Sequence, residues 1–270
     1  MANLIGSENM VGLTIERRGA VAILVIENQS RRNCLTAEMW RQLEPILDSL
    51  EVDETVTVLV VTGAGDDFSA GADIRDLDQI LNAPTGADGG WITAAEDALA
   101  RFGKPTIAAI DGYCVGGGWE LAGACDVRIA SSRATFGVTP SRIGIVYPLS
   151  GIARLVAIAG PAVAKLLLFS GDLVSASEAQ RFGMVSRVVE ADAVLPEALA
   201  FAAHLADRSQ LSIRAMKEIV DAIASGDDAE TVAARWQAEV TASDEPAIGA
   251  AAFIGKERPQ FTWRAPSQHR

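Results

Sequence analysis

Two short glycine-bearing segments, each directly after an apolar run, constrain this chain more than any other feature. Their sequences are FSAGADI (residues 68–74) and DGYCVGGGWE (residues 111–120). The apolar runs are typical of buried strands, so each segment is expected to be a strand-to-helix turn with unpaired backbone N–H groups. Glycine lets a ligand lie against the main chain, and a helix start adds the positive end of its dipole. The pair therefore predicts a site for an oxyanion.

A carboxylate follows the second segment at helical spacing. Glu120 lies three residues after Gly117, which places it on the same face of the predicted helix, about one turn along. A proton carrier beside an oxyanion site indicates an enzyme. The alternative role for Glu120, a carboxylate that only stabilises the helix dipole, stays open.

Three motifs, in order, resemble the enoyl-CoA hydratase/isomerase, or crotonase, superfamily. They are RNCL (residues 32–35), the two glycine segments, and AFIGKERP (residues 252–259). The resemblance covers nearly the whole chain. It implies an α/β fold of the crotonase type, a spiral of repeated β-β-α turns. Residues 1–191 would form the core with the CoA and active sites, and residues 192–270 a C-terminal all-helical oligomerisation region.

Apolar patterning alone predicts an α/β core, because strands and helices alternate. The expected strands are a hairpin at residues 13–27, with its second strand buried on both faces, and strands at 56–61, 106–110 and 126–130. A helix capped by Thr36 is expected to run to Leu50. Further helices are expected at residues 73–81, 91–101 and 117–124, with a loop at 82–90.

The pattern changes after Asp192, the expected N-cap of a run of helices without strands. These helices are predicted at residues 193–206, 211–224 and 229–241. The second carries an apolar face of Leu211, Met216, Ile219, Val220 and Ile223. Such a face packs either on the chain's own core or on a neighbouring subunit. The resemblance favours the second, and so a homotrimer or hexamer.

The resemblance also assigns the site residues. The N–H groups of Ala72 and Gly117 would hold the oxygen of an acyl-CoA thioester, and Glu120 would move protons. The coenzyme A moiety would be bound by Arg32, Ala70, Asp73, Ile74 and Lys256, with Lys256 able to act from a neighbouring subunit. The coenzyme A thioester is expected as substrate, with no separate cofactor and no metal.

The reaction type is less well specified. A hydratase of this family carries a second glutamate in a segment resembling FxxPExxxG, but in FGVTPSRIG (residues 136–144) its place is taken by Pro140, which carries no proton. The stretch TPSRIGIVY (residues 139–147) resembles instead the methylmalonyl-CoA decarboxylase branch, with Tyr147 as its active-site tyrosine. That branch has histidine where this chain has Ala72. Hydration or isomerisation is the first expectation, in fatty acid metabolism, and decarboxylation of a malonyl-type CoA the second.

Composition narrows the partners. The formal net charge is −12 and the isoelectric point is near 4.7, which disfavours nucleic acid and anionic membranes as partners. The N-terminus has no basic and apolar leader, and no run of eighteen apolar residues occurs, so a cytoplasmic location is expected. Cys34, Cys114 and Cys125 lack metal or redox spacing and are interpreted as reduced packing residues.

Three other classes of protein are alternatives to an acyl-CoA enzyme. The strand followed by Gly63-Ala64-Gly65 is a partial dinucleotide motif, but Phe68 stands at its third glycine position. A zinc or serine hydrolase would have to rely on His204 and His269, the only two histidines. An inactive CoA-binding homologue would keep the fold and show no turnover.

Overall fold

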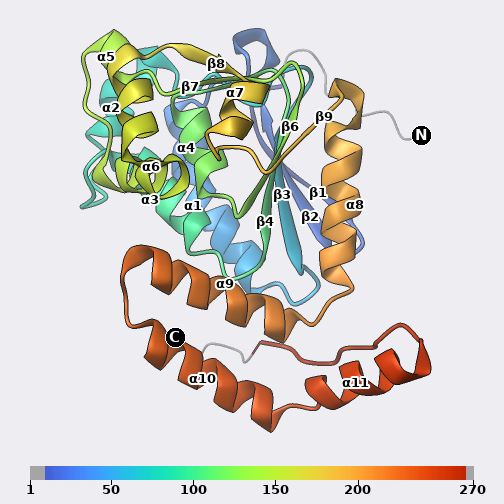
Figure 1. Ribbon diagram of the computed structural model, residues 1–270. Helices are drawn as coiled ribbons and strands as arrows, with labels where there is room; N and C mark the ends of the chain where they lie inside the picture. Colours follow the sequence, from blue (N-terminus) through green and yellow to red (C-terminus); the bar gives the residue numbers. More distant parts are fainter. Residues whose placement is uncertain (1–9, 266–270) are drawn as a thin grey trace.

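The main sheet of the molecule has six strands in the order β1-β2-β3-β4-β6-β9 (Figure 1). The computed structural model describes residues 10–265. The sheet consists of β1 (Gly12–Arg18), β2 (Val21–Glu27), β3 (Val58–Gly63), β4 (Thr106–Ile110), β6 (Val127–Ser131) and β9 (Arg187–Val189). Only β1 is antiparallel to its neighbour, and the other pairs are parallel. The hairpin and the three single strands expected from the sequence are confirmed, with ends shifted by one or two residues.

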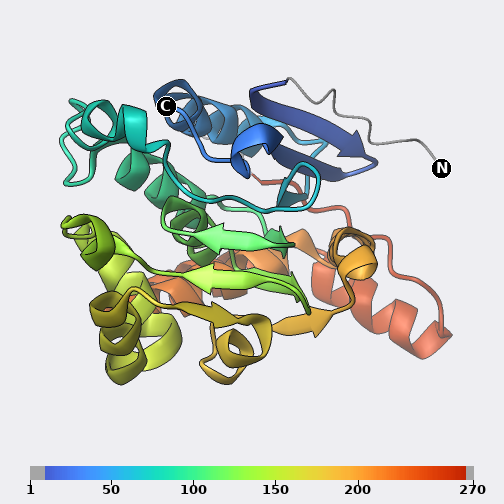
Figure 2. The same cartoon turned by 90° about the horizontal axis from the view of Figure 1, so that it is seen from above.

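A second sheet of three short strands has the order β5-β7-β8 (Figure 2). Its strands are β5 (Tyr113–Val115), β7 (Thr135–Gly137) and β8 (Leu173–Ser175). Along the chain, β4 of the main sheet is followed by β5 of the second sheet and then by α4 (Gly117–Ala124). The strands β6 and β7 repeat this step before α5 (Pro140–Ile143). This repeated β-β-α turn is the predicted spiral.

The two faces of the main sheet are buried against different layers. Val21, Ile23 and Val25 of β2 pack toward α8 (Val194–Ala206), whereas Ala22, Leu24 and Ile26 face the larger core cluster. That larger cluster takes side chains from α1 (Ala37–Val52), α3 (Gly90–Ala100) and α4. Because β2 is buried on both sides, its run of apolar residues is continuous, as the sequence indicated.

Caps and loop ends explain most helix boundaries. The hydroxyl of Thr36 accepts a hydrogen bond from Met39 N at 3.3 Å, which confirms the predicted start of α1. The expected helix at residues 73–81 is divided into η2 (Ile74–Asp76) and α2 (Leu77–Leu81). The predicted N-cap Asp192 was wrong: it lies inside η3 (Ala191–Ala193), and Ala193 precedes α8. The remaining short helices are η1 (Gln29–Arg31) and α7 (Ala176–Arg181).

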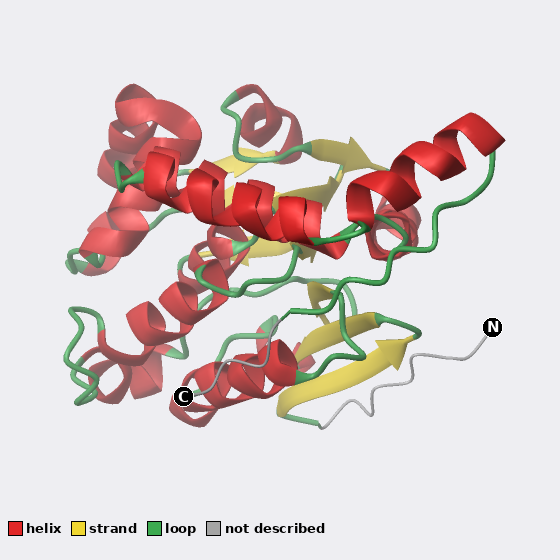
Figure 3. Ribbon diagram, turned by 90° about the horizontal axis from the view of Figure 1, so that it is seen from below, coloured by secondary structure: helices red, strands yellow, loops and turns green. Residues whose placement is uncertain are grey.

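Three helices extend beyond the sheet: α9 (Gln210–Ser225), α10 (Ala229–Ala242) and α11 (Glu245–Gly255). Seen from below, these helices lie across the molecule in front of the strands (Figure 3). The expected apolar face of α9 splits in two, since Leu211 is buried while Met216, Val220 and Ile223 are more than half exposed. Leu211 packs on this chain, and Met216, Val220 and Ile223 face outward.

Helix α6 (Leu149–Ser170) is long and apolar enough to cross a membrane by length and composition. Gly160 has non-helical angles (φ 77°, ψ 160°) and precedes Pro161, so two shorter helices meet there at a kink. Each is far shorter than the ~20 residues that a membrane span needs. Arg154, Lys165 and contacts of α6 with α3 and α4 identify α6 as part of the globular packing.

Candidate functional site

The two glycine segments predicted from the sequence lie against each other. Ser69 N donates to Tyr113 O at 2.8 Å, and Val115 N donates to Ser69 O at 3.0 Å. These bonds form a parallel bridge between the chain after β3 and strand β5. At the far end of the bridge, a Cβ built on Gly71 would lie 2.7 Å from Val115 O and 3.0 Å from Gly117 N. Gly71 also has φ of +97°, so both its conformation and its close neighbours require glycine.

Where the two glycine segments meet, a point called the crossing below, two backbone N–H groups are available to a ligand. Within residues 10–265, neither Ala72 N nor Gly117 N donates to a protein acceptor, whereas the amides on both sides of Ala72 and the amide before Gly117 do. Gly71 N donates to Ser69 Oγ, Asp73 N to Leu35 O, and Gly116 N to Gly137 O. A Cβ built on Gly117 would lie 3.4 Å from Ala72 N, so the two free amides are neighbours. The predicted pair of donors is therefore brought together.

Trp40 of α1 forms a wall beside Gly117. The tryptophan is 1% exposed, and a Cβ on Gly117 would lie 2.7 Å from its Cζ2 atom. Gly117 is the first residue of α4 and its φ lies outside the left-handed region, so space, not conformation, requires glycine there. The sequence did not show this contact, because Trp40 and Gly117 lie on different helices.

Glu120 lies in the first turn of α4 and is 4% exposed. Its backbone N–H donates to Gly116 O at 3.1 Å, which fixes the turn that starts at the free Gly117 amide. Burial, followed by the nearby carboxylate of Glu96, raises the pKa of Glu120 well above its usual value. Its Oε1 atom has no hydrogen-bond partner among the described residues. A buried carboxyl group with a raised pKa and a free oxygen is a candidate to exchange a proton with a ligand.

A second buried carboxylate, Glu96 of α3, was missed by the sequence analysis. It is 0% exposed and is held by Ser150 and Arg154, both on α6. Burial raises its pKa to about 7, although Arg154 opposes the shift. One signal was available: Glu96 lies four residues after Ile92 and three before Leu99, on the buried face of α3.

The segment after β7 gives no carboxylate to the site. Gly116 N donates to Gly137 O at 2.9 Å, so this segment begins next to the glycine run. Pro140 then starts α5 as its first helical residue and is buried. Tyr147, farther along, is 7% exposed, and its hydroxyl lies 3.9 Å from a Cβ built on Gly116. Burial raises the pKa of Tyr147 well above its usual value, and its hydroxyl has no hydrogen-bond partner in the described chain.

The residues assigned to coenzyme A are only partly gathered. Ala70 and Ile74 flank the crossing on the same segment as Ala72, and Ile74 is 69% exposed. The guanidinium of Arg32 lies over the ring of Tyr113, 4.1 Å from its centroid. Lys256 caps the far end of α11, which lies away from α4 in this chain (Figure 1). A ligand role for Lys256 thus stays a prediction that needs a second subunit.

Asp73 has a visible structural role. It is 4% exposed and accepts from Arg75 Nε at 3.0 Å and from Arg31 Nη1 at 3.3 Å. These bonds tie the first glycine segment to the end of η1. The side-chain hydrogen bond from Arg75 lowers the pKa of Asp73 to about 2. The expected contact between Asp73 and coenzyme A stays a prediction.

We expect Asp73→Asn to lower the free energy of unfolding by about 1–2 kcal/mol, because two charge-assisted hydrogen bonds are weakened. The stabilisation by Asp73 should be fully present above pH 3.8, the ordinary pKa, and lost as the pH falls through about 2. Urea unfolding at pH 7 and pH 3 measures both effects. Asp78→Asn, an exposed aspartate on α2, is the matched control and should change stability little. An equal loss in both variants would contradict the role of Asp73.

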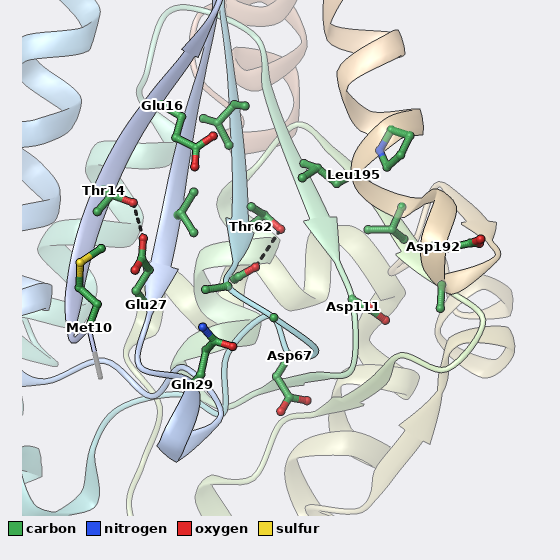
Figure 4. Close-up of a pocket in the computed structure, with 18 of the residues that line it drawn as sticks. Met10, Thr14, Glu16, Glu27, Gln29, Thr62, Asp67, Asp111, Asp192 and Leu195 are labelled. Atoms are coloured by element: carbon green, nitrogen blue, oxygen red, sulfur yellow. Dashed lines mark hydrogen bonds between the residues drawn. The ribbon is translucent and has the colours of Figure 1, made fainter. Parts of the chain in front are cut away.

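The cavity of about 570 Å³ beside β1, β2, β3 and the start of α8 is a different place (Figure 4). Thr14 donates to Glu27 there at 2.7 Å. The lining carries Glu16, Glu27, Asp67, Asp111 and Asp192, and Arg18 is its one basic residue. Such a lining repels the phosphates of coenzyme A. Ala72, Gly117 and Glu120 are not part of it, so this cavity is not the predicted site.

Metal and hydrolase chemistry find no support in the described part of the chain. No cluster of three or more histidine, cysteine, aspartate or glutamate residues there could hold a metal ion. His204 lies on α8 beside the Arg208 guanidinium, remote from Glu120 in sequence and fold, and His269 lies outside the described residues. Cys34, Cys114 and Cys125 are free and buried, as expected for packing residues.

Comparison with known proteins identifies the family of this chain. The sequence profile described as Enoyl-CoA hydratase/isomerase matches residues 16–264. The chain belongs to the enoyl-CoA hydratase/isomerase family. A probable enoyl-CoA hydratase of Mycobacterium leprae is 35% identical over 246 residues, which cover 90% of this chain and 95% of the relative. A crotonyl-CoA hydratase of Syntrophomonas wolfei is 35% identical over 214 residues, covering 78% and 80%.

Solved structures confirm the crotonase fold. A crystal structure of an enoyl-CoA hydratase/isomerase family member has a TM-score of 0.90 and 37% identity, covering 95% of this chain and 98% of that one. An enoyl-CoA hydratase of Bacillus anthracis has a TM-score of 0.86 and 27% identity, covering 92% and 98%. The resemblance deduced from three motifs is therefore confirmed for family and fold.

Proposed function

We propose that this protein is an enoyl-CoA hydratase or isomerase that acts through a thioester enolate. The observation that carries the proposal is the pair of free amides, Ala72 N and Gly117 N, at one crossing with the buried Glu120 one turn away. Two preorganised donors stabilise negative charge on the thioester oxygen, which is what makes the α-carbon acidic enough to react. The family assignment supports an acyl-CoA as the substrate.

Within this site, Glu120 is the residue proposed to move protons. For isomerisation, its carboxylate takes a proton from the α-carbon of a 3-enoyl thioester and returns it to the γ-carbon, so a single carboxyl suffices. Hydration also needs a group that activates water. Pro140 occupies the position expected for that group and cannot do so. Isomerisation is thus the reaction that the geometry favours.

Three substrates offered in parallel test the proposal. Purified protein is mixed with crotonyl-CoA, a 3-enoyl-CoA or methylmalonyl-CoA, and thioester absorbance and CO2 release are followed. Consumption of the 3-enoyl-CoA with formation of the conjugated product is the expected result. Turnover of none of the three would favour the alternative of an inactive CoA-binding homologue.

Decarboxylation of a malonyl-type CoA is the second candidate, because Tyr147 lies beside the site with its hydroxyl buried and unpaired. Loss of CO2 forms the enolate directly, after which a single proton donor completes the reaction. We expect Tyr147→Phe to slow CO2 release from methylmalonyl-CoA about 10²-fold if Tyr147 is that donor. Unchanged CO2 release in the variant would remove this role.

A homotrimer or hexamer is part of the same proposal. Met216, Val220 and Ile223 on α9, with Phe253 and Ile254 on α11, present large apolar side chains outward. Such surfaces are typical of subunit contacts. Light scattering of the purified protein measures the mass, and a monomer at micromolar concentration would contradict the proposal. The cytoplasmic location stays a prediction.

A further inference from the structure

A narrow gap over Gly151 separates Glu120 from the second buried carboxylate, Glu96. A Cβ built on Gly151, in the first turn of α6, would lie 3.0 Å from Glu120 Oε1 and 3.5 Å from Glu96 Oε2. Glycine at this position leaves the gap open. The two carboxyl groups come from different helices, α4 and α3, and both are at least 96% buried. Nothing in the sequence motifs of the family pointed to this pairing.

The partners of the two carboxyl groups are unequal. Ser150 Oγ donates to Glu96 Oε1 at 2.5 Å, and Arg154 Nη1 donates to Glu96 Oε2 at 2.9 Å. Glu120 Oε1 has no partner in the described part of the chain. Both carboxyl groups approach the same point over Gly151, and in a dry environment the repulsion of two neighbouring negative charges disfavours ionisation of both. The cation and the hydroxyl favour the charge on Glu96, so the proton rests on Glu120.

From this arrangement, and resting on the proposed function, we propose that Glu96 and Glu120 hold a single proton between them across Gly151. Glu96 is then a positioning residue that decides when Glu120 can give or take a proton. With the proton on Glu120, this residue is an acid; with the proton on Glu96, Glu120 is a base. In turnover, the C–H bond at the α-carbon breaks toward Glu120, and Glu120 forms the new C–H bond. Glu96 forms no bond to substrate.

The other charged and titratable groups around the pair are few. Asp97 of α3 shares Arg154 with Glu96, at 3.3 Å from its Nη2 atom. Tyr147, which precedes α6, feels the charge of both glutamates, and its raised pKa keeps its phenol neutral. Arg154 is thus the single cation on the pair within residues 10–265; it binds Glu96, and its charge lowers the pKa of both carboxyl groups. Substitutions that remove the charge of Glu96 or of Arg154 should therefore shift the pKa of Glu120 in opposite directions.

The pH dependence of kcat/KM for the 3-enoyl-CoA tests this directly. Because Glu120 must be ionised to take the α-proton, kcat/KM rises with pH as Glu120 loses its proton, and this acid limb reports the apparent pKa of the pair. Glu96→Gln removes the neighbouring negative charge, so we expect the acid limb to move to lower pH by about one unit or more. Arg154→Met removes the cation, and the same limb should move to higher pH. Arg154→Lys keeps a cation and should restore the profile toward wild type.

Asp97→Asn is the matched control, since Asp97 binds the same arginine without facing Glu120. We expect its acid limb to stay within about half a pH unit of wild type. A purely structural Glu96 would lower stability or kcat but leave the position of the limb unchanged. That result in Glu96→Gln would overturn the proposal.

Infrared spectroscopy of the substrate-free protein separates this proposal from the proposed function. At pH 8 ordinary carboxyl groups are ionised, so a protonated carboxyl band reports only groups with a raised pKa. We expect the band in wild type and in Asp97→Asn, its loss in Glu120→Gln, and its titration at a lower pH in Glu96→Gln, where burial still raises the pKa of Glu120 but the neighbouring charge is gone. Absence of the band in wild type, or a band that titrates at the same pH in Glu96→Gln as in wild type, would refute proton sharing, whether or not any acyl-CoA is turned over.

Discussion

Gly117→Pro is expected to lower kcat/KM about 10²–10³-fold on every acyl-CoA that the enzyme accepts. Proline has no N–H, so the substitution removes one of the two donors at the thioester oxygen, and loss of such a donor costs about 2.7–4 kcal/mol. The first turn of a helix tolerates proline, because its N–H has no partner within the helix. Steady-state kinetics with the active substrate, alongside circular dichroism, measures the loss.

The added Cβ has to be separated from the lost N–H. It would lie 2.7 Å from Trp40 Cζ2, so both Gly117→Pro and Gly117→Ala are made in a Trp40→Phe background, which removes that atom. Gly117→Ala adds the same Cβ and keeps the donor. We expect the alanine variant to retain most of the activity of its background. Equal activity in the proline and alanine variants would mean that Gly117 N–H holds no developing charge.

Much of the fold was predictable because its signals are local. The second strand of the hairpin is a continuous apolar run, since α8 covers one face of β2 and the larger core covers the other. Thr36 caps α1 as its sequence indicated. Helix α4 begins at Gly117 and ends at Ala124, the bounds expected from the sequence.

The elements that were not predicted depend on tertiary context. Helix α6 contains Gly160 and Pro161, which interrupt its helical pattern, and it forms as two joined helices on the surface of α3 and α4. The region before α8 was assigned a cap at Asp192, but the chain makes a short 3-10 turn there first. On α9, the sequence showed one apolar face, and only packing shows which of its side chains turn inward.

The site, like the fold, has parts that the local sequence predicts and parts that depend on tertiary packing. The two glycine segments predicted unpaired N–H groups, because a turn after a buried strand leaves them without partners, and the family resemblance assigned them to Ala72 and Gly117. The carboxylate of Glu96 belongs to another helix, and its distance from Glu120 depends on how α3, α4 and α6 pack. The missing glutamate at Pro140 was visible in the sequence. That a different helix brings a carboxylate near Glu120 was not.

Glu120→Gln is expected to lower kcat about 10²–10⁴-fold while KM changes little, because the substitution removes proton transfer and keeps both backbone donors. Gln is nearly isosteric with Glu and cannot exchange a proton. Exchange of the α-hydrogen of a bound acyl-CoA with deuterated water, followed by NMR, should be lost in the variant. Binding of the same acyl-CoA, measured by calorimetry, should persist. Unchanged α-hydrogen exchange would remove Glu120 from the reaction.

The pH dependence of stability is a second measurement on Glu120→Gln. The pKa of Glu120 is raised by burial, so its contribution to stability is present below the ordinary carboxyl pKa and is lost as the pH rises toward the raised value. Glutamine does not titrate, and Glu120→Gln should therefore gain stability relative to wild type as the pH is raised from about 5 to 9. Glu245→Gln, a buried glutamate on α11 that accepts from the backbone of Thr262 and Trp263, is the control. Because both backbone N–H groups donate to Oε1 of Glu245, its substitution should lower stability at pH 7. The opposite signs of the two changes in stability distinguish Glu120, a buried acid placed to transfer a proton, from a carboxylate that only supports the fold.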